Sequence, residues 1–175
     1  MDEHLVISAL GADKPGIINE LSRLTLDQEC NILDTRMTVL GDAFALLMMV
    51  SGPGEALSTL RQNLSHAATS LELTVTFQNA QSKPHQEPAL PYQALIIAID
   101  NLGIVHDITG FFSDKLINIE EMHTETYAAP HTGTRMFSLS VEIKIPGGLN
   151  ISNLKEEFAT FCDELNLDAS IEPCK

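Results

Sequence analysis

The sequence is poor in basic residues, and this scarcity excludes one large class of function. Lysine and arginine together number 10 against 24 acidic residues, which leaves a net charge of -14 at pH 7. Proteins that bind DNA depend on basic side chains to neutralise phosphates, and a basic patch is their usual signature. The composition therefore argues against direct binding to nucleic acid and favours a protein or a small molecule as the partner.

Cysteine and long apolar runs are also scarce. The three cysteines, Cys30, Cys162 and Cys174, are widely spaced and form no CxxC pair, so neither a disulfide framework nor a zinc site is indicated. No apolar run approaches the roughly 18 residues of a membrane helix. The first residues, MDEHLVISAL, include two acids and no basic region of the kind found in signal peptides. We expect a cytoplasmic protein that does not bind membranes.

Motifs for catalysis and metal binding are missing as well. The sequence contains no Ser-His-Asp or Cys-His arrangement, paired-carboxylate site or P-loop that we recognise. The group His123, Glu125 and His131 matches no common zinc spacing. An acylphosphatase-type enzyme needs a basic phosphate cradle, whereas the loop GADKPG offers one lysine and no arginine. We expect no metal, no resident cofactor and no enzymatic activity.

The chain does contain an internal repeat, which appears when the sequence is shifted by 87 residues against itself. The segment DKPGII then falls on DNLGIV, and the register pairs Asp13 with Asp100, Gly16 with Gly103 and Ile17 with Ile104. It continues without a gap to place Asn31 on Asn118. A unit of this size exceeds the 20 to 50 residues of common solenoid repeats. The repeat therefore predicts two copies of a whole small domain.

A polar segment that contains three prolines separates the two copies. It has no apolar period and is typical of a fairly stiff linker. This gives the predicted organisation: a first domain over residues 1–78, a proline-rich linker over 79–91 and a second domain over 92–175. The division rests on composition and on the repeat.

Hydrophobic periodicity predicts the same order of elements in each half: strand, helix, strand, strand, helix, strand. In the first half, strands are expected over 4–10, 33–40 and 44–50, with a turn at Gly41-Asp42 between the last two. The first helix is expected to bury a face of Ile17, Leu21 and Leu24, and the second a face of Leu57, Leu60 and Leu64. The alternation of Leu71, Leu73, Val75 and Phe77 predicts the last strand.

The second half repeats this order. A strand is expected over 92–100, alternation continues over 137–145, and a short last strand covers 167–171. The expected helix faces are Ile104, Ile108 and Phe111, followed by Leu154, Phe158, Phe161 and Leu165. The order predicts an α+β fold of two ferredoxin-like βαββαβ domains, each an antiparallel sheet with both helices on one face. The free sheet edges allow pairing into a homodimer.

Three segments, LVISALGADKPGI, CNILDTRMTVLGDAFALLMMVSG and LKEEFATFCDELNLDASI, resemble the tandem ACT-domain family of glycine cleavage system transcriptional repressors. The resemblance covers both repeats and is strongest over residues 5–52. It implies an amino-acid-sensing regulator that has no DNA-binding domain of its own. Such a regulator holds a LysR-type activator of the glycine cleavage operon, and glycine releases that hold. The alternative is an amino-acid-binding regulatory module of a metabolic enzyme assembly.

The resemblance also implies candidate ligand-binding residues. The family's D-x-x-G loop motif falls on Asp13 and Gly16 and on Asp100 and Gly103, and its asparagine after the helix falls on Asn31 and Asn118. Pro15, Ile17 and Ile104 flank these positions. The second loop, DNLGIV, lacks the proline of the first, which sets the two candidate sites apart.

The residue types in this loop suit the chemistry of an amino acid. First-turn N–H groups of a helix lack internal partners and attract an anion such as a carboxylate. Gly16 would let the ligand approach those amides, or it serves only a tight turn. Asp13 would accept from the ligand's ammonium group, or it caps the helix, which is the preferred interpretation. Asn31 and Asn118 are expected foremost as left-handed helix stops, and the alternative is that their amides donate to a carboxylate across a domain interface.

Overall fold

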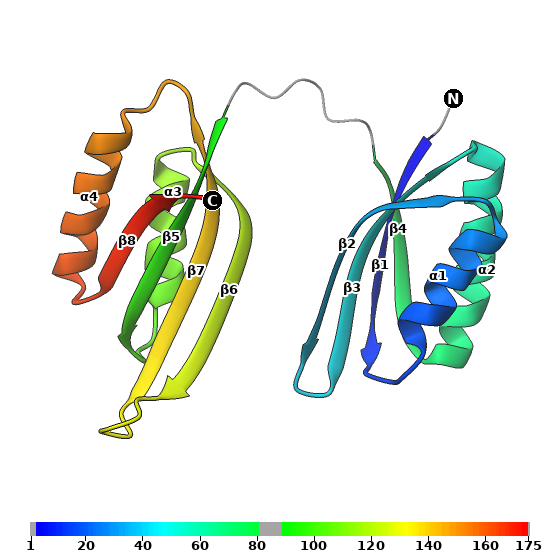
Figure 1. Ribbon diagram of the computed structural model, residues 1–175, viewed down its shortest axis with the longest axis horizontal. Helices are drawn as coiled ribbons and strands as arrows, with labels where there is room; N and C mark the ends of the chain where they lie inside the picture. The colour runs from blue at the N-terminus through cyan, green and yellow to red at the C-terminus, as the bar shows by residue number, and fades with distance from the viewer. Residues whose placement is uncertain (1–2, 81–88, 175) are drawn as a thin grey trace. The chain divides into compact units, whose positions relative to one another are not determined.

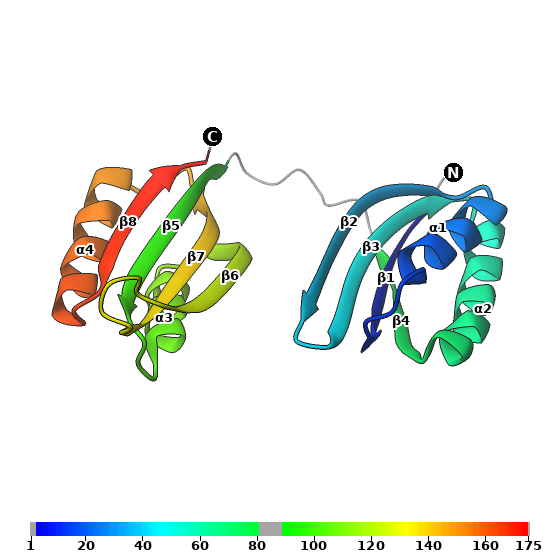
Figure 2. The same cartoon turned by 60° about the horizontal axis from the view of Figure 1, so that its bottom comes forward.

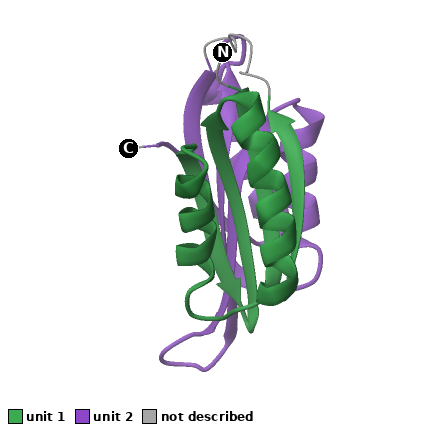
Figure 3. Ribbon diagram, turned by 90° about the vertical axis from the view of Figure 1, so that its right-hand side faces the viewer, with its two compact units in different colours: residues 1–84 green, residues 85–175 purple. Residues whose placement is uncertain are grey.

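The computed structural model describes residues 3–80 and 89–174, and the chain divides into two compact units, residues 1–84 and 85–175 (Figures 1 and 3). The first unit contains β1 (Glu3–Ala12), α1 (Ile17–Asp27), β2 (Asn31–Leu40), β3 (Ala43–Gly52), α2 (Gly54–Leu71) and β4 (Leu73–Ala80). The second contains β5 (Ala89–Ile99), α3 (Ile104–Asp114), β6 (Asn118–Ala128), β7 (Arg135–Pro146), α4 (Ile151–Glu164) and β8 (Asp168–Pro173).

Each unit is a four-stranded antiparallel sheet with two helices against one face (Figures 1 and 2). The strand orders are β2-β3-β1-β4 and β6-β7-β5-β8, so the first and third strands of each unit lie at the centre and the second and fourth form the edges. This is the βαββαβ topology, and it confirms the predicted α+β fold of two ferredoxin-like domains.

Each unit has a hydrophobic core of its own between its sheet and its helices. In the first unit, alternate residues of the two central strands point inward, such as Leu5 and Ile7 on β1, and Leu60 and Leu64 of α2 close the core at 0% exposure. In the second unit the helices contribute aromatic rings. Phe112 of α3 stacks on Phe158 of α4 with ring centroids 5.3 Å apart.

The structure corrects several predicted residues on the helix faces. On α3 the fully buried ring is that of Phe112, and Phe111 is only half-buried. On α4, Cys162 occupies the buried position after Phe158, whereas Leu165 lies past the end of the helix. Both faces therefore follow a spacing of four residues. On α4 the prediction chose the larger Phe161 over its buried neighbour Cys162, and on α3 it chose between two adjacent phenylalanines.

Two element boundaries also differ from the sequence prediction. Leu71 is the last residue of α2 and not part of the strand, because Glu72 ends the helix with a left-handed backbone (φ 55°). The predicted linker, residues 79–91, lies largely outside the described residues, but β4 continues through Ala80 and β5 begins at Ala89. Pro91 fits within β5 near its start, where its carbonyl accepts from the backbone N–H of Cys174 at 3.1 Å.

The described residues give two further results. None of their helices is long and apolar enough to cross a membrane. Over residues 3–80 and 89–174, no three histidine, cysteine or acidic side chains gather closely enough to hold a metal ion.

Candidate functional site

A glycine in the left-handed region precedes the first helix of each unit. Gly16 (φ 95°) caps α1 and Gly103 (φ 98°) caps α3. Residues with a Cβ rarely adopt this conformation, so the backbone itself requires glycine here. A Cβ at Gly16 would meet nothing within 4 Å, and one at Gly103 would lie 3.6 Å from Asp107 Oδ2. The space beside Gly16 is therefore open, whereas a Cβ at Gly103 would be in van der Waals contact with the Asp107 carboxylate.

The backbone N–H groups that follow each glycine are available to a ligand. The first bond inside α1 runs from Glu20 N to Gly16 O, and that inside α3 from Asp107 N to Gly103 O, both at 2.9 Å. The N–H groups of residues 17–19 and 104–106 precede these bonds and have no acceptor within their helices. In the described part of the chain, no side chain accepts from them. Their free hydrogens and the helix dipole favour an anion at this point.

The two aspartates of the loop motif are placed alike but paired differently. Each donates its backbone N–H to the hairpin of its unit, Asp13 to Asp42 O in the turn before β3 at 2.9 Å and Asp100 to Arg135 O at the start of β7 at 3.0 Å. Asp100 also accepts from Arg135 Nε at 2.7 Å. The preferred interpretation of Asp13 as a helix cap was wrong, since Gly16 is the cap residue and no side chain caps the helix.

A pocket of about 380 Å³ lies beside the second glycine loop. Its walls are the end of β5 with the loop that follows, the first turn of α3, and the turn from α4 into β8. The lining residues are Ala98, Ile99, Asp100, Asn101, Leu102, Ile104, Asp107, Leu165, Asn166 and Leu167. The pocket contains two of the predicted site residues, Asp100 and Ile104. The sequence analysis missed the α4–β8 turn, because nothing in the local sequence shows that it folds back against the loop.

The same two turns of the first unit are joined by an ion pair. Lys14 Nζ donates to Glu72 Oε2 at 2.5 Å, and this hydrogen bond, assisted by the lysine charge, lowers the pKa of the Glu72 carboxyl below its ordinary value. Lys14 aligns with Asn101, and Glu72 aligns with Asn166, because both end the second helix in a left-handed conformation before a buried leucine. Neither asparagine is charged, so no equivalent ion pair spans the pocket of the second unit.

The remaining predicted site residues have different placements. Pro15 is exposed beside Gly16, while the side chains of Ile17 (2% exposed) and Ile104 (6%) pack into the cores. These two isoleucines therefore have only their backbone N–H groups to offer a ligand.

Asn31 and Asn118 lie far from the glycine loops of their own units. Asn31 begins β2 beyond the end of α1, and its partner Ser51 pairs with His4 at the start of β1, whereas the glycine loop follows the end of β1. Asn118 begins β6, and its side chain donates to Glu120 Oε1 at 2.7 Å. The prediction that these asparagines are left-handed helix stops was wrong, because Glu29 and Leu116 hold that conformation. Other residues can also hold this conformation, because it costs a single residue with a Cβ only about 1–2 kcal/mol.

Comparison with known proteins identifies the family of this fold. The model of the ACT domain matches residues 3–78, and a UPF0237 protein of Methanopyrus kandleri is 36% identical over 76 residues, which cover 84% of that protein. The chain belongs to the ACT-domain family. The matched segment is the first unit, and the second repeats its topology strand for strand.

Two relatives match the tandem ACT chain as a whole. The glycine cleavage system transcriptional repressor of Escherichia coli is 27% identical over 168 residues, or 96% of this chain and 88% of the repressor. A crystal structure provisionally assigned to a glycine cleavage system transcriptional repressor is 28% identical, with a TM-score of 0.77 over 100% of this chain and 99% of the other. A protein of unknown function from Galdieria sulphuraria shares the fold, with a TM-score of 0.84 at 24% identity. These results confirm the resemblance found in the sequence.

Proposed function

We propose that this tandem ACT-domain protein is a non-enzymatic regulator that senses a small amino acid and acts through a protein partner. The observation that carries the proposal is the duplicated loop, in which a left-handed glycine exposes a row of free N–H groups beside an aspartate. An amino acid offers the matching pair of charges. Its carboxylate would accept from the N–H groups at residues 17–19 and 104–106, and its ammonium group would donate to Asp13 or Asp100.

Differences between the two loops suggest that the two sites are not equivalent. The second unit has a pocket whose lining includes Asn101 and Asn166 together with Asp100 and Asp107, whereas the first unit has the Lys14–Glu72 ion pair across the same two turns. A ligand entering the first site would have to displace or bypass this pair. We therefore place the stronger amino-acid site at Asp100, Gly103 and the first turn of α3. Glycine is the proposed effector.

The relatives and the charge of the chain support a protein partner in preference to DNA. The E. coli relative is a transcriptional repressor, yet this chain carries 24 acidic against 10 basic residues. A strongly acidic protein is repelled by DNA phosphates. We propose that it controls transcription by holding a LysR-type activator, and that glycine weakens this hold.

Thermal unfolding in the presence of amino acids tests the proposed sensing. A ligand that binds only the folded state at about 100 times its Kd stabilises it by about 2.7 kcal/mol, which corresponds to a rise in Tm of roughly 11–22 °C for a domain of this size. Glycine, among a panel of amino acids monitored by circular dichroism, is expected to produce such a rise. An equal concentration of acetate with methylamine, which carries the two charges on separate molecules, is the control and is expected to have little effect.

Capture from a cell lysate tests the proposed partner. A LysR-type activator is expected to be captured from lysate by the immobilised chain without glycine and released when glycine is added. If no amino acid raises the Tm beyond the acetate and methylamine control, the sensing function is wrong. If glycine raises the Tm but leaves the captured activator in place, the coupling between the two is wrong.

A further inference from the structure

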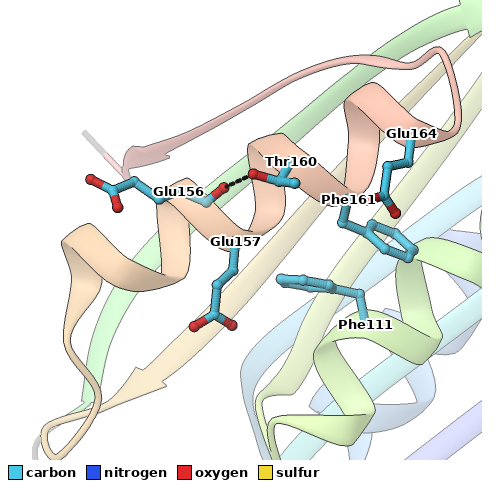
Figure 4. A pocket seen from close by; sticks show the side chains of 6 residues that line it. All are labelled: Phe111, Glu156, Glu157, Thr160, Phe161 and Glu164. Atoms are coloured by element: carbon cyan, nitrogen blue, oxygen red, sulfur yellow. Dashed lines mark hydrogen bonds between the residues drawn. The ribbon is translucent and has the colours of Figure 1, made fainter.

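The helix side of the second unit carries a groove of about 480 Å³ that the proposed amino-acid site does not use. It lies between α3 and α4 and is lined by Phe111, Glu156, Glu157, Thr160, Phe161 and Glu164 (Figure 4). The rings of Phe111 and Phe161 meet across the gap between the two helices, with centroids 5.1 Å apart and planes tilted by 34°. Both rings are half-buried, so an apolar floor remains accessible from solvent.

Carboxylates follow this floor along the exposed side of α4. Glu156 and Glu164 are separated by eight residues, which is about 12 Å along a helix. Within residues 3–80 and 89–174, neither makes an ion pair. Thr160 lies between them and donates its hydroxyl to the backbone carbonyl of Glu156 at 3.0 Å. The groove thus presents an aromatic floor beside two unneutralised charges about two helical turns apart.

One end of the groove already contains a cation of the chain itself. Lys115 Nζ lies 4.9 Å from the centre of the Phe111 ring and pairs with Glu157. A cation is attracted both by an aromatic face and by a neighbouring carboxylate. Lys115 thus shows that this surface attracts a basic side chain. Phe161, Glu156 and Glu164 remain available to basic or apolar side chains of another molecule.

The first unit provides an internal comparison. Aligning the buried residues Leu60, Leu64 and Ala68 of α2 with Leu154, Phe158 and Cys162 of α4 matches the groove positions on α4 one by one. The 87-residue repeat matches Phe111 of α3 with Leu24 of α1. The counterparts in the first unit are Leu24, Gln62, Asn63, His66, Ala67 and Ser70. None of these is acidic or a phenylalanine. The fold therefore does not require the acidic aromatic groove, which is particular to the second unit.

We propose that this groove docks a basic amphipathic helix of a protein partner. A groove between two helices suits the apolar stripe of a third helix, whose side chains repeat at the same spacing. Leucine-type residues would cover the rings of Phe111 and Phe161, and lysines or arginines two turns apart would meet Glu156 and Glu164. Complementary charge at the rim of an interface contributes mainly to specificity and to the rate of association. The inference deepens the proposed function, because it names the surface and the kind of partner through which the regulator acts.

A labelled peptide tests the groove on the intact chain. The probe is a leucine-striped helix with flanking lysines, about 18 residues long because isolated helices below about 15 residues are marginal. Fluorescence anisotropy is expected to show saturable binding that weakens at least tenfold in the Glu156→Gln/Glu164→Gln variant. The Asp163→Asn/Asp168→Asn variant loses the same charge at positions that do not line the groove, and it is expected to bind as the native chain does.

Equal binding by the native chain and the Glu156→Gln/Glu164→Gln variant would overturn the proposal. So would an equal loss in both double variants, which would show attraction to the acidic chain as a whole. The same peptide with glutamates in place of lysines is expected not to bind, and its binding would also overturn the proposal. The rise in Tm with glycine, measured on the same variants, separates peptide docking from amino-acid sensing. If the peptide does not bind as expected but glycine still raises the Tm, the groove proposal is wrong and the proposed amino-acid sensing stands.

Discussion

The Phe158→Ala variant is expected to lose about 3–5 kcal/mol of stability in the second unit, because the removed ring leaves a cavity that the packed core cannot close. Phe158 is 1% exposed. Its ring centroid lies 5.3 Å from that of Phe112, on which it stacks, and 5.1 Å from that of Phe111, which it meets edge to face. The chain has no tryptophan, and its two tyrosines, Tyr92 and Tyr127, belong to the second unit. Tyrosine fluorescence during urea unfolding therefore reports on that unit.

A matched variant tests whether the two cores are independent. Leu64 occupies the aligned position of α2 in the first unit and is 0% exposed. Leu64→Ala is expected to cost about 2–5 kcal/mol in the first unit, which far-ultraviolet circular dichroism detects, while the tyrosine transition keeps its midpoint. If Phe158→Ala and Leu64→Ala shift the tyrosine transition equally, the two units do not unfold separately.

Replacing both loop glycines by asparagine, Gly16→Asn/Gly103→Asn, is expected to abolish the rise in Tm produced by glycine while the fold is kept. Asparagine tolerates the left-handed conformation better than other residues with a Cβ. Its side chain would enter the space beside each glycine, which is open at Gly16 and bordered by Asp107 at Gly103, and would cover the free N–H groups. Thermal unfolding with and without glycine measures the effect, and circular dichroism of the variant checks the fold.

Valine at the same positions provides the contrast. A β-branched residue at a φ near 95° strains the backbone, and each such site costs of order 1–3 kcal/mol. Gly16→Val/Gly103→Val is therefore expected to unfold at a lower temperature than the asparagine variant. An asparagine variant that glycine stabilises as strongly as the native chain would remove these loops from the proposed site.

Much of the fold could be predicted because its signals are local and occur twice. The periodicity around Ile17 and Ile104 predicted a helix in each half, and the repeat of Gly16 as Gly103 predicted a glycine loop before each of these helices. The choice between Phe111 and Phe112 could not be made in this way. Both are apolar and adjacent, and only the packing of α3 against Phe158 shows which ring is inside.

The surroundings of the loops depend on contacts between distant residues. Lys14 and Glu72 are separated by 58 positions, and no local pattern indicates that the two turns meet. The same holds for Asp100 and Asn166, which line one pocket. The acidic aromatic groove had a weaker signal, since Glu157, Phe161 and Glu164 recur at a helical spacing, but the contribution of Phe111 required the structure.

The central claim, that an amino acid binds at the free N–H groups behind the loop glycines, is tested most directly by a ¹H–¹⁵N NMR titration with glycine. The account predicts saturable shifts at the amides of residues 103–106, with smaller or weaker shifts at residues 16–19 behind the Lys14–Glu72 ion pair. Shifts confined to residues outside both loops, or none at glycine concentrations that raise the Tm, would contradict it.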